Sequence, residues 1–195
     1  EPLAVGLQAA EKAKIIPGES ALVMGCGPIG LVIALTALAG GCSKVFIADI
    51  VSKKLEMCKN YNNLIPIDLN KDNPAEIVKK NTNNWGANII FEASGATKAY
   101  DVIFDSICPA GKVVIVGNPM NSIPMDFATL LTKEIEIKTV FRYAHQYERA
   151  INLLSSNKID VKPMITDTVA FDDSIKAFER AAKNLPEDVK IQIQL

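Results

Sequence analysis

The chain has 195 residues, 49% of them hydrophobic, and its 21 lysines and arginines nearly balance its 22 aspartates and glutamates. That length is sufficient for one sizeable hydrophobic core. The near-neutral charge argues against nucleic acid or an anionic membrane surface as a partner, because both favour a basic protein surface. Hydrophobic runs stay shorter than the roughly 18 residues that a membrane-spanning helix needs. We therefore expect no nucleic-acid partner and no membrane association.

The predicted elements begin with a helix over Pro2–Lys14, which Pro17 and Gly18 end. Short β-branched runs then alternate with helical stretches, and almost wholly apolar strands in such an alternation predict an α/β fold with a doubly wound parallel sheet of the Rossmann type. The expected strands are Ser20–Met24, Lys44–Ala48, Leu64–Ile67, Ala87–Glu92, Gly111–Val116 and Ile135–Thr139. The expected helices between them are Ile29–Ala39, Ser52–Asn60, Asn73–Lys80, Thr97–Ile107 and Asp126–Thr132.

The last part of the chain departs from this alternation. We expect a helix, a strand, a helix and a strand over Gln146–Ser155, Val161–Phe171, Ser174–Asn184 and Val189–Leu195. The last strand alternates strictly, which suits a half-exposed strand, and the first six strands offer its buried face no obvious partner. We therefore expect residues 1–155 to form a nucleotide-binding domain with its lead-in helix, and residues 156–195 to return toward a catalytic domain that is missing from this chain.

The four cysteines show none of the close, repeated spacings of a disulfide framework or a cysteine zinc site. Cys26, Cys42, Cys58 and Cys108 each fall in or beside an apolar stretch, which predicts reduced and mostly buried thiols. No basic segment precedes a cleavable apolar stretch, so we expect a cytoplasmic protein. The chain opens without an initiating Met, however, and an upstream segment can be missing.

Residues 25–30 read Gly-Cys-Gly-Pro-Ile-Gly, directly between the first predicted strand and an apolar helix. In this context G-x-G-x-x-G indicates dinucleotide binding. Gly25 allows a tight turn, Gly27 lets the backbone approach a diphosphate, and Gly30 lets the helix pack closely on the strand. Pro28 and Ile29 precede the third glycine, where main-chain N–H groups at the helix start face the phosphates.

Asp49 stands at the tip of the second predicted strand, about 20 residues beyond the glycines, where an acid is the expected ligand of the adenosine ribose. Its carboxylate would repel a 2′-phosphate, which favours NAD over NADP, although Lys53 and Lys54 could soften that preference. The alternative interpretation is that Asp49 caps the helix that starts near Ser52.

Two further strand ends point to the same crevice, because ligands of open α/β sheets bind outside the carboxyl ends of the strands. Residues 93–96 read Ala-Ser-Gly-Ala and residues 117–119 read Gly-Asn-Pro. Small residues there would let backbone groups reach a nicotinamide. Ordinary turn formation is an equally good interpretation of Gly95 and Gly117.

Several segments together resemble the sorbitol and xylitol dehydrogenases, the polyol branch of the zinc-containing medium-chain alcohol dehydrogenases. They are Glu-Pro-Leu-Ala-Val-Gly at 1–6, Gly-Cys-Gly-Pro-Ile-Gly at 25–30, Phe-Glu-Ala-Ser-Gly at 91–95, Val-Phe-Arg-Tyr at 140–143 and Val-Lys-Pro-Met-Ile-Thr at 161–166. The resemblance covers essentially the whole chain, and the Arg-Tyr pair is its most specific part.

The resemblance implies a role for particular residues in holding NAD. Ile29 and Gly30 would lie at the diphosphate, Asp49 at the ribose, and Lys54 near the adenosine in place of the family's arginine. Main-chain groups after the fifth and sixth strands would hold the nicotinamide; they belong to Val116, Gly117, Asn118, Val140, Phe141 and Arg142.

The resemblance also implies catalytic roles. Glu1 would lie at the catalytic zinc, directly or through water, while Arg142 and Tyr143 would contact substrate hydroxyl groups. A forked guanidinium and a phenol suit a polyol with several hydroxyls to orient, and Glu1 and Arg142 could also pair with each other. From spacing alone, Glu1 is equally an acid favoured by a helix N-terminus, and Arg142 and Tyr143 are surface residues at a strand end.

The expected activity is NAD-dependent, zinc-assisted oxidation of a secondary hydroxyl of a polyol to a ketose. The family's remaining zinc ligands, a Cys, a His and an adjacent Glu, have no counterpart in this chain, so we expect it to be inactive alone. His145 is interpreted as a loop or surface residue. Members of the family are usually homodimers or homotetramers, and the strand Ile135–Thr139 could supply the edge at which they join.

Two alternatives remain open at this point. One is another zinc dehydrogenase of the same superfamily that acts on threonine or a diol. The other is a non-catalytic NAD-binding module, in which Glu1 and Arg142 are ordinary surface residues. The Arg-Tyr pair favours a polyol substrate, and an upstream Cys and His-Glu pair would distinguish an enzyme from a binding module.

Overall fold

The computed structural model describes residues 1–183 and 185–195, and within them six parallel strands form one sheet in the order β3-β2-β1-β4-β5-β6. The strands of this sheet are β1 (Ser20–Met24), β2 (Lys44–Asp49), β3 (Leu64–Asp68), β4 (Ala87–Glu92), β5 (Ile107–Ile115) and β6 (Glu136–Thr139). The helices around it are α1 (Pro2–Ala13), α2 (Pro28–Ala39), α3 (Ser52–Leu55), α4 (Pro74–Asn81), α5 (Tyr100–Ser106), α6 (Phe127–Lys133) and α7 (Tyr147–Ser155). The predicted doubly wound parallel fold is therefore confirmed.

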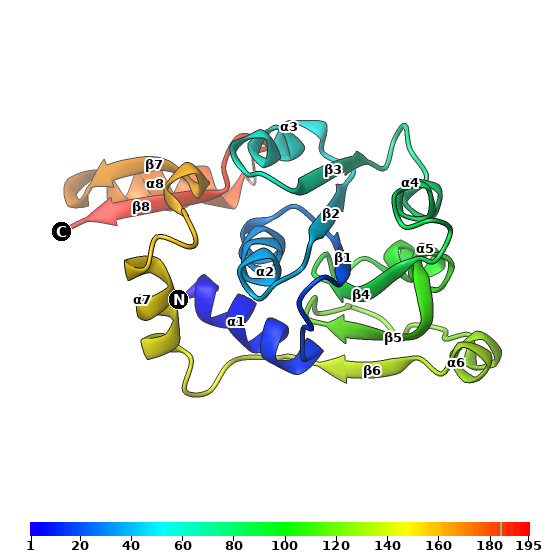
Figure 1. Cartoon of the computed structure of the whole chain (residues 1–195). Coiled ribbons are helices and arrows are strands. Elements are labelled where there is room, and N and C mark those ends of the chain that lie inside the picture. Colours follow the sequence, from blue (N-terminus) through cyan, green and yellow to red (C-terminus); the bar gives the residue numbers. More distant parts are fainter. Residues whose placement is uncertain (184) are drawn as a thin grey trace.

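The apolar strands are buried because helices cover the sheet on both sides (Figure 1). All five residues of β1 are buried, and successive side chains point to opposite faces. Ala21 and Val23 join the core beneath α1 and α2, whereas Leu22 and Met24 join the core beneath α4 and α5. This two-sided burial explains why the strands read as continuous hydrophobic runs instead of alternating ones.

The lead-in helix α1 is part of the same core and packs directly against α2. A Cβ atom placed on Gly6 would lie 2.7 Å from the carbonyl oxygen of Val32, so the two helix backbones approach too closely for any side chain at that position. Ala9 and Ala13 are fully buried on the same helix. Close contact of small residues thus fixes the N-terminal segment to the helix that covers one face of the six-stranded sheet.

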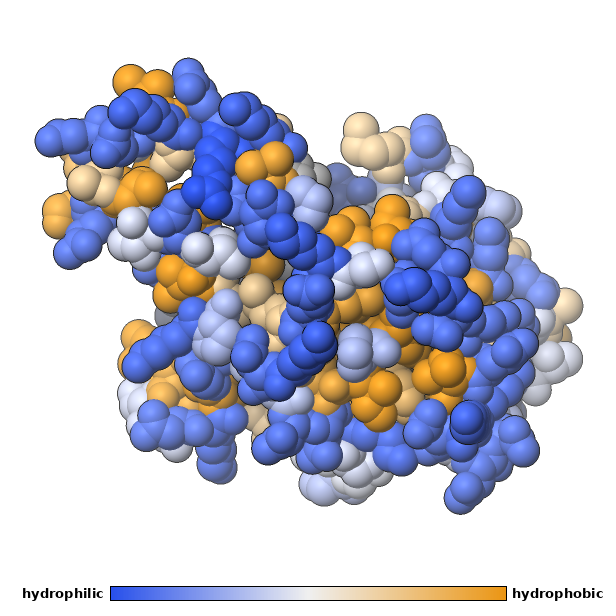
Figure 2. Space-filling view, turned by 90° about the horizontal axis from the view of Figure 1, so that it is seen from above, coloured by the Kyte–Doolittle hydropathy of each residue, from blue (hydrophilic) through white to orange (hydrophobic). Residues whose placement is uncertain are grey.

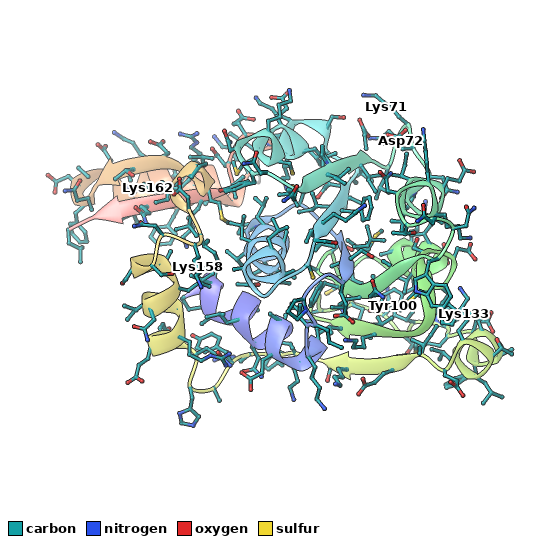
Figure 3. All side chains as sticks on the ribbon, in the orientation of Figure 1. Lys71, Asp72, Tyr100, Lys133, Lys158 and Lys162 are labelled. Atoms are coloured by element: carbon teal, nitrogen blue, oxygen red, sulfur yellow. The ribbon has the colours of Figure 1, made fainter. Side chains whose placement is uncertain are left out.

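Two predicted helices were wrong in their extent. The segment Ser52–Asn60 is one α-helical turn, α3, followed by a 3-10 helix over Glu56–Asn60. The segment Thr97–Ile107 is a 3-10 turn over Thr97–Ala99 followed by α5, and Ile107 already begins β5. Lys133 extends from α6 toward α5 (Figure 3) and donates hydrogen bonds to the carbonyl oxygens of Phe104 and Ile107, so it satisfies main-chain acceptors where α5 ends.

The fifth strand was also predicted too short. It begins at Ile107 instead of Gly111, and its pairing with β4 shifts register between Ala87 and Ile89. Ala110 adopts a left-handed φ of 56° within this irregular stretch. The strand β5 ends at Ile115, so Val116 lies just beyond it in the loop that follows.

Residues beyond α7 form a C-terminal unit that contains a parallel pair of strands, β7 (Ile165–Ala170) and β8 (Lys190–Gln194), and the helix α8 (Ser174–Ala182). Its buried residues Met164 and Val189 belong to the core beneath α1 and α2. The prediction of one strand over Val161–Phe171 was wrong, because 3-10 turns over Lys162–Met164 and Phe171–Asp173 flank β7. The helix predicted over Ser174–Asn184 is α8, and Asn184 lies outside the described residues. The strand β8 does find its partner within the chain, in β7 and not in the large sheet.

This C-terminal unit exposes much of its apolar surface. Phe171, Ile175 and Phe178 are 60%, 73% and 70% exposed. Figure 2 shows hydrophobic atoms among hydrophilic ones over this unit, at the upper left of the view.

The division of the chain at residues 155 and 156 stays a prediction. No helix in the described part of the chain has the length and apolarity that crossing a membrane requires.

The four cysteines are buried and unpaired, as predicted, which generates a test of the core. Burial, with the negative charge of Glu19, raises the pKa of the Cys42 thiol to about 12. Because the thiolate is the reactive form, we expect the native chain at about pH 8 to react with Ellman's reagent far more slowly than the unfolded chain. Unfolding in denaturant should expose all 4 thiols. Fast labelling of native Cys42, located by mass spectrometry, would contradict the buried placement.

Candidate functional site

The junction between β1 and α2 is a tight glycine turn. Gly25 has a φ of 102°, which only glycine adopts without strain. A Cβ atom on Gly30 would overlap the carbonyl oxygen of Gly25, so the helix sits directly against the end of the strand. Gly27 caps α2 with φ −80° and ψ −176°, and a Cβ atom there would meet nothing within 4 Å. The fold itself therefore requires glycine at positions 25 and 30, whereas Gly27 has ordinary backbone angles and borders open space.

The first turn of α2 points main-chain donors toward that space. Pro28 has no N–H, and the amides of Ile29 and Gly30 lie in the first turn, where no intrahelical acceptor is available. The helix dipole adds positive potential at the same end. The open position above Gly27 is thus suited to a diphosphate.

Asp49 ends β2 beside this turn and fixes it. One carboxylate oxygen accepts a hydrogen bond from the main-chain N–H of Cys26 at 2.6 Å, and the other accepts one from Val51 at 2.8 Å. The alternative interpretation of Asp49 as a helix cap is not supported, because α3 has Val51 at its N-cap and no side-chain cap bond. A carboxylate has about four acceptor positions, so half-buried Asp49 keeps capacity for two hydroxyl groups.

The loops after β5 and β6 lie at the carboxyl ends of the strands on the other side of β1 from Asp49. Val116, Gly117 and Asn118 follow β5, and the N–H groups of Val116 and Gly117 both donate to the carbonyl oxygen of Glu92 at 2.8 Å. Asn118 is exposed and Val140 is buried, with its N–H bonded to Ile115. The ends of β4, β5 and β6 are therefore neighbours, as the predicted crevice requires.

Two of the three candidate catalytic residues, Glu1 and Tyr143, lie close together, and Tyr147 contacts Tyr143. Tyr143 and Tyr147 share a hydrogen bond of 2.9 Å between their hydroxyls and stack edge to face at 5.3 Å. That hydrogen bond, lost hydration and the neighbouring Glu1 carboxylate raise the pKa of Tyr143. Glu1 and Tyr143 are thus brought together across the chain.

Arg142 is exposed just after β6, a position compatible with both interpretations that the sequence left open. Among the described residues it makes no ion pair with Glu1, and its guanidinium instead lies 5.6 Å from the ring centre of Phe141. Phe141 is 84% exposed, so this pair projects into solvent at the end of β6. Lys54 lies on α3, where its carbonyl oxygen accepts a weak hydrogen bond from the Cys26 thiol. His145 is an exposed loop residue, as predicted.

A family model described as "Zinc-binding dehydrogenase" matches residues 28–156, which run from the start of α2 to the end of α7 and include β2 to β6 of the six-stranded sheet. The chain belongs to this family. It is 44% identical over 185 residues to the D-xylulose reductase of Morganella morganii, covering 94% of this chain and 54% of that protein. It is 33% identical over 196 residues to the sorbitol dehydrogenase of Ovis aries, covering 98% of this chain and 55% of that protein.

Solved structures of dehydrogenases share the fold over the whole chain. The 2R,3R-butanediol dehydrogenase of Bacillus subtilis superposes with a TM-score of 0.92 at 24% identity, and the match covers 100% of this chain and 56% of that one. At this identity the likeness shows the fold alone. The zinc-binding dehydrogenase chain described here spans about half the length of the curated relatives it matches.

The zinc-binding dehydrogenase chain does not carry a metal site by itself. Across residues 1–183 and 185–195, no group of three or more His, Cys, Asp or Glu side chains could hold a metal ion. Glu1 is exposed and stands as a single carboxylate near Tyr143. The residues present therefore do not fit zinc, and its ligation by Glu1 stays a prediction for the longer protein.

Two residues at these sites were missed by the sequence analysis. Glu92 is completely buried at the end of β4, where it follows three apolar residues, Ile89, Ile90 and Phe91, and precedes the small residues of the predicted crevice. Tyr147 holds Tyr143 from the first turn of α7. An acid that ends an apolar strand was a usable signal for Glu92, whereas nothing in the sequence distinguishes Tyr147 from an ordinary helix residue.

The geometry of the turn predicts that two similar glycine-to-alanine substitutions differ in their effect on stability. Gly30→Ala should lower the free energy of unfolding by about 1–3 kcal/mol, because the new Cβ overlaps the Gly25 carbonyl. Gly27→Ala should change stability by less than about 1 kcal/mol, since its backbone angles suit alanine and the space is open. Urea denaturation of both variants measures this. Equal destabilisation by both substitutions would contradict the described turn.

Proposed function

We propose that this chain is the NAD-binding part of a polyol dehydrogenase that oxidises a secondary hydroxyl, as of sorbitol or xylitol, to a ketose. The observation that carries the proposal is the open position above Gly27, bordered by unpaired helix amides and by the Asp49 carboxylate. The printed names of the relatives, D-xylulose reductase and sorbitol dehydrogenase, support the polyol substrate and its ketose product.

In this proposal the chain's own residues bind and orient the cofactor. The amides of Ile29 and Gly30 hold the diphosphate, and Asp49 accepts hydrogen bonds from the ribose hydroxyls. The same carboxylate repels a 2′-phosphate, so NAD is preferred to NADP. Lys54 lies near the adenosine. When bound, NAD supplies an acceptor for the hydride that leaves the substrate carbon.

The nicotinamide half lies over the strand ends on the other side of the crevice. Main-chain groups of residues 116–118 and 140–142 hold the carboxamide and fix the ring. Arg142 and Tyr143 orient substrate hydroxyls by hydrogen bonding, with Glu1 beside Tyr143. The remaining groups of the active site, including the zinc ligands, would come from the part of the longer protein that this chain does not contain.

For the longer protein we further propose a cytoplasmic homodimer or homotetramer. The strand β6 is at the edge of the six-stranded sheet, where a second copy could continue the sheet.

The substrate preference is tested on the same longer protein. Turnover of sorbitol or xylitol in preference to threonine and a simple diol is the expected result, and preference for threonine or the diol would overturn it.

The cofactor assignment is tested by titrating the chain with NAD and NADP in a calorimeter. Asp49→Ala should weaken NAD binding by at least about tenfold, because charged hydrogen bonds to the ribose are lost. It should also reduce the discrimination against NADP. If both affinities stay unchanged, the ribose assignment is wrong.

Two further variants complete this titration, one as a control and one as a test of the diphosphate position. Asp105→Ala removes an exposed acid at the end of α5, just before β5 begins and so at the opposite edge of the sheet from the crevice. It should bind NAD as the wild type does. Gly27→Ala should keep its stability but bind NAD less tightly, because its methyl group occupies the space for the diphosphate. Unchanged NAD affinity in Gly27→Ala would place the diphosphate elsewhere.

A further inference from the structure

Glu92 is a buried acid to which neither the family resemblance nor the proposed cofactor contacts give a role. It is the last residue of β4, and its exposed fraction is 0%. Burial of a carboxylate is unfavourable unless hydrogen bonds replace its hydration. The position of such a group, at a strand end that faces the cofactor crevice, calls for a physical reason.

Among the described residues, the hydrogen bonds to the Glu92 carboxylate all come from the turn that follows it. The carboxylate accepts from the main-chain N–H of Ser94 at 2.8 Å, from the Ser94 hydroxyl and from the main-chain N–H of Gly95 at 3.0 Å. Gly95 adopts a left-handed φ of 67° in this turn. Bonds to a charged acceptor are roughly twice as strong as neutral ones. The carboxylate therefore fixes the path of residues 93–96.

That turn is in contact with two other loops of the crevice. A Cβ atom on Gly25 would lie 3.1 Å from Cα and N of Ser94, and one on Gly95 would lie 3.0 Å from the carbonyl oxygen of Asn118. A Cβ atom on Gly117 would lie 2.5 Å from the second carboxylate oxygen of Glu92. Glu92 thus lies beneath the point where the loops after β1, β4 and β5 meet.

The position of this junction in the sheet determines which half of the cofactor it affects. The strand order places β2 and β3 on one side of β1, and β4, β5 and β6 on the other. Asp49 ends β2 on the first side, while Glu92 ends β4 on the second. A dinucleotide bound across such a switch point lies with its two halves on opposite sides.

We propose that Glu92 is a positioning residue for the nicotinamide half of the cofactor. Its buried carboxylate holds residues 93–96 against residues 116–118, and so shapes the crevice without touching the adenosine half. This inference rests on the proposed NAD binding. It predicts that loss of the carboxylate weakens binding of the whole dinucleotide but not of its adenosine and diphosphate part.

The test compares NAD with ADP, which contains only the adenosine half with its diphosphate. Glu92→Gln keeps the size of the side chain but removes its negative charge, which weakens the bonds that one carboxylate oxygen accepts from Ser94 and Gly95. Its NH₂ group also cannot accept the Gly95 N–H that reaches the other oxygen at 3.3 Å. We expect this variant to bind NAD roughly tenfold more weakly and ADP as tightly as the wild type. Asp49→Ala is the matched control, and it should weaken both ligands.

A second measurement does not depend on any ligand. Amide hydrogen exchange at Ser94 and Gly95, followed by NMR, should accelerate in Glu92→Gln, while exchange at Leu22 in the core strand β1 should not. Ser94→Ala removes the hydroxyl that donates to Glu92 and accepts from the main-chain N–H of Ala96, at an exposed position, and leaves the carboxylate in place. It should show both effects in weaker form. This variant decides the question if Glu92→Gln does not fold.

The outcomes separate this inference from the proposed function. Equal weakening of NAD and ADP, or wild-type NAD binding by both variants, would overturn the role of Glu92. If the wild-type chain binds no NAD, the proposed function fails instead. The exchange rates at Ser94 and Gly95 then still show whether Glu92 holds the turn, and unchanged rates would refute that.

Discussion

The first turn of α2 lies directly against the end of β1. This contact is possible because Gly30 has no side chain, and its backbone can therefore pack on the carbonyl oxygen of Gly25. The other features of the crevice depend on this contact. It directs the first helix amides toward the open position at Gly27, and it presents the Cys26 N–H to the Asp49 carboxylate. Any side chain at Gly30 would separate the strand from the helix and disturb each of these at once.

Two acids at the ends of the strands on either side of β1 illustrate how burial determines what a carboxylate can do. Asp49 is half-buried, accepts one main-chain bond on each oxygen and still has acceptor capacity for a ligand. Glu92 is fully buried, and the turn that follows it supplies the donors for its carboxylate. The first geometry suits recognition of a ribose, whereas the second suits the support of a loop. The same residue chemistry is therefore used for contact on one side of β1 and for positioning on the other.

The sequence predicted the features that depend on local pattern. The apolar strands, the glycine turn and Asp49 follow from hydrophobic runs and residue spacing, and the structure places them as expected. Features that depend on distant contacts were missed or misjudged. The burial of Glu92 requires loops from three strands, the Tyr143–Tyr147 bond requires the start of α7, and the division of residues 52–60 into two helix types leaves no mark in the pattern.

The central claim is that the glycine turn and Asp49 together bind one dinucleotide. A crystal structure of the chain grown with NAD tests it most directly. The account predicts diphosphate density above Gly27 and ribose hydroxyls within hydrogen-bonding distance of the Asp49 carboxylate. Density for the nucleotide at another surface, or a crevice without nucleotide at saturating NAD, would contradict it.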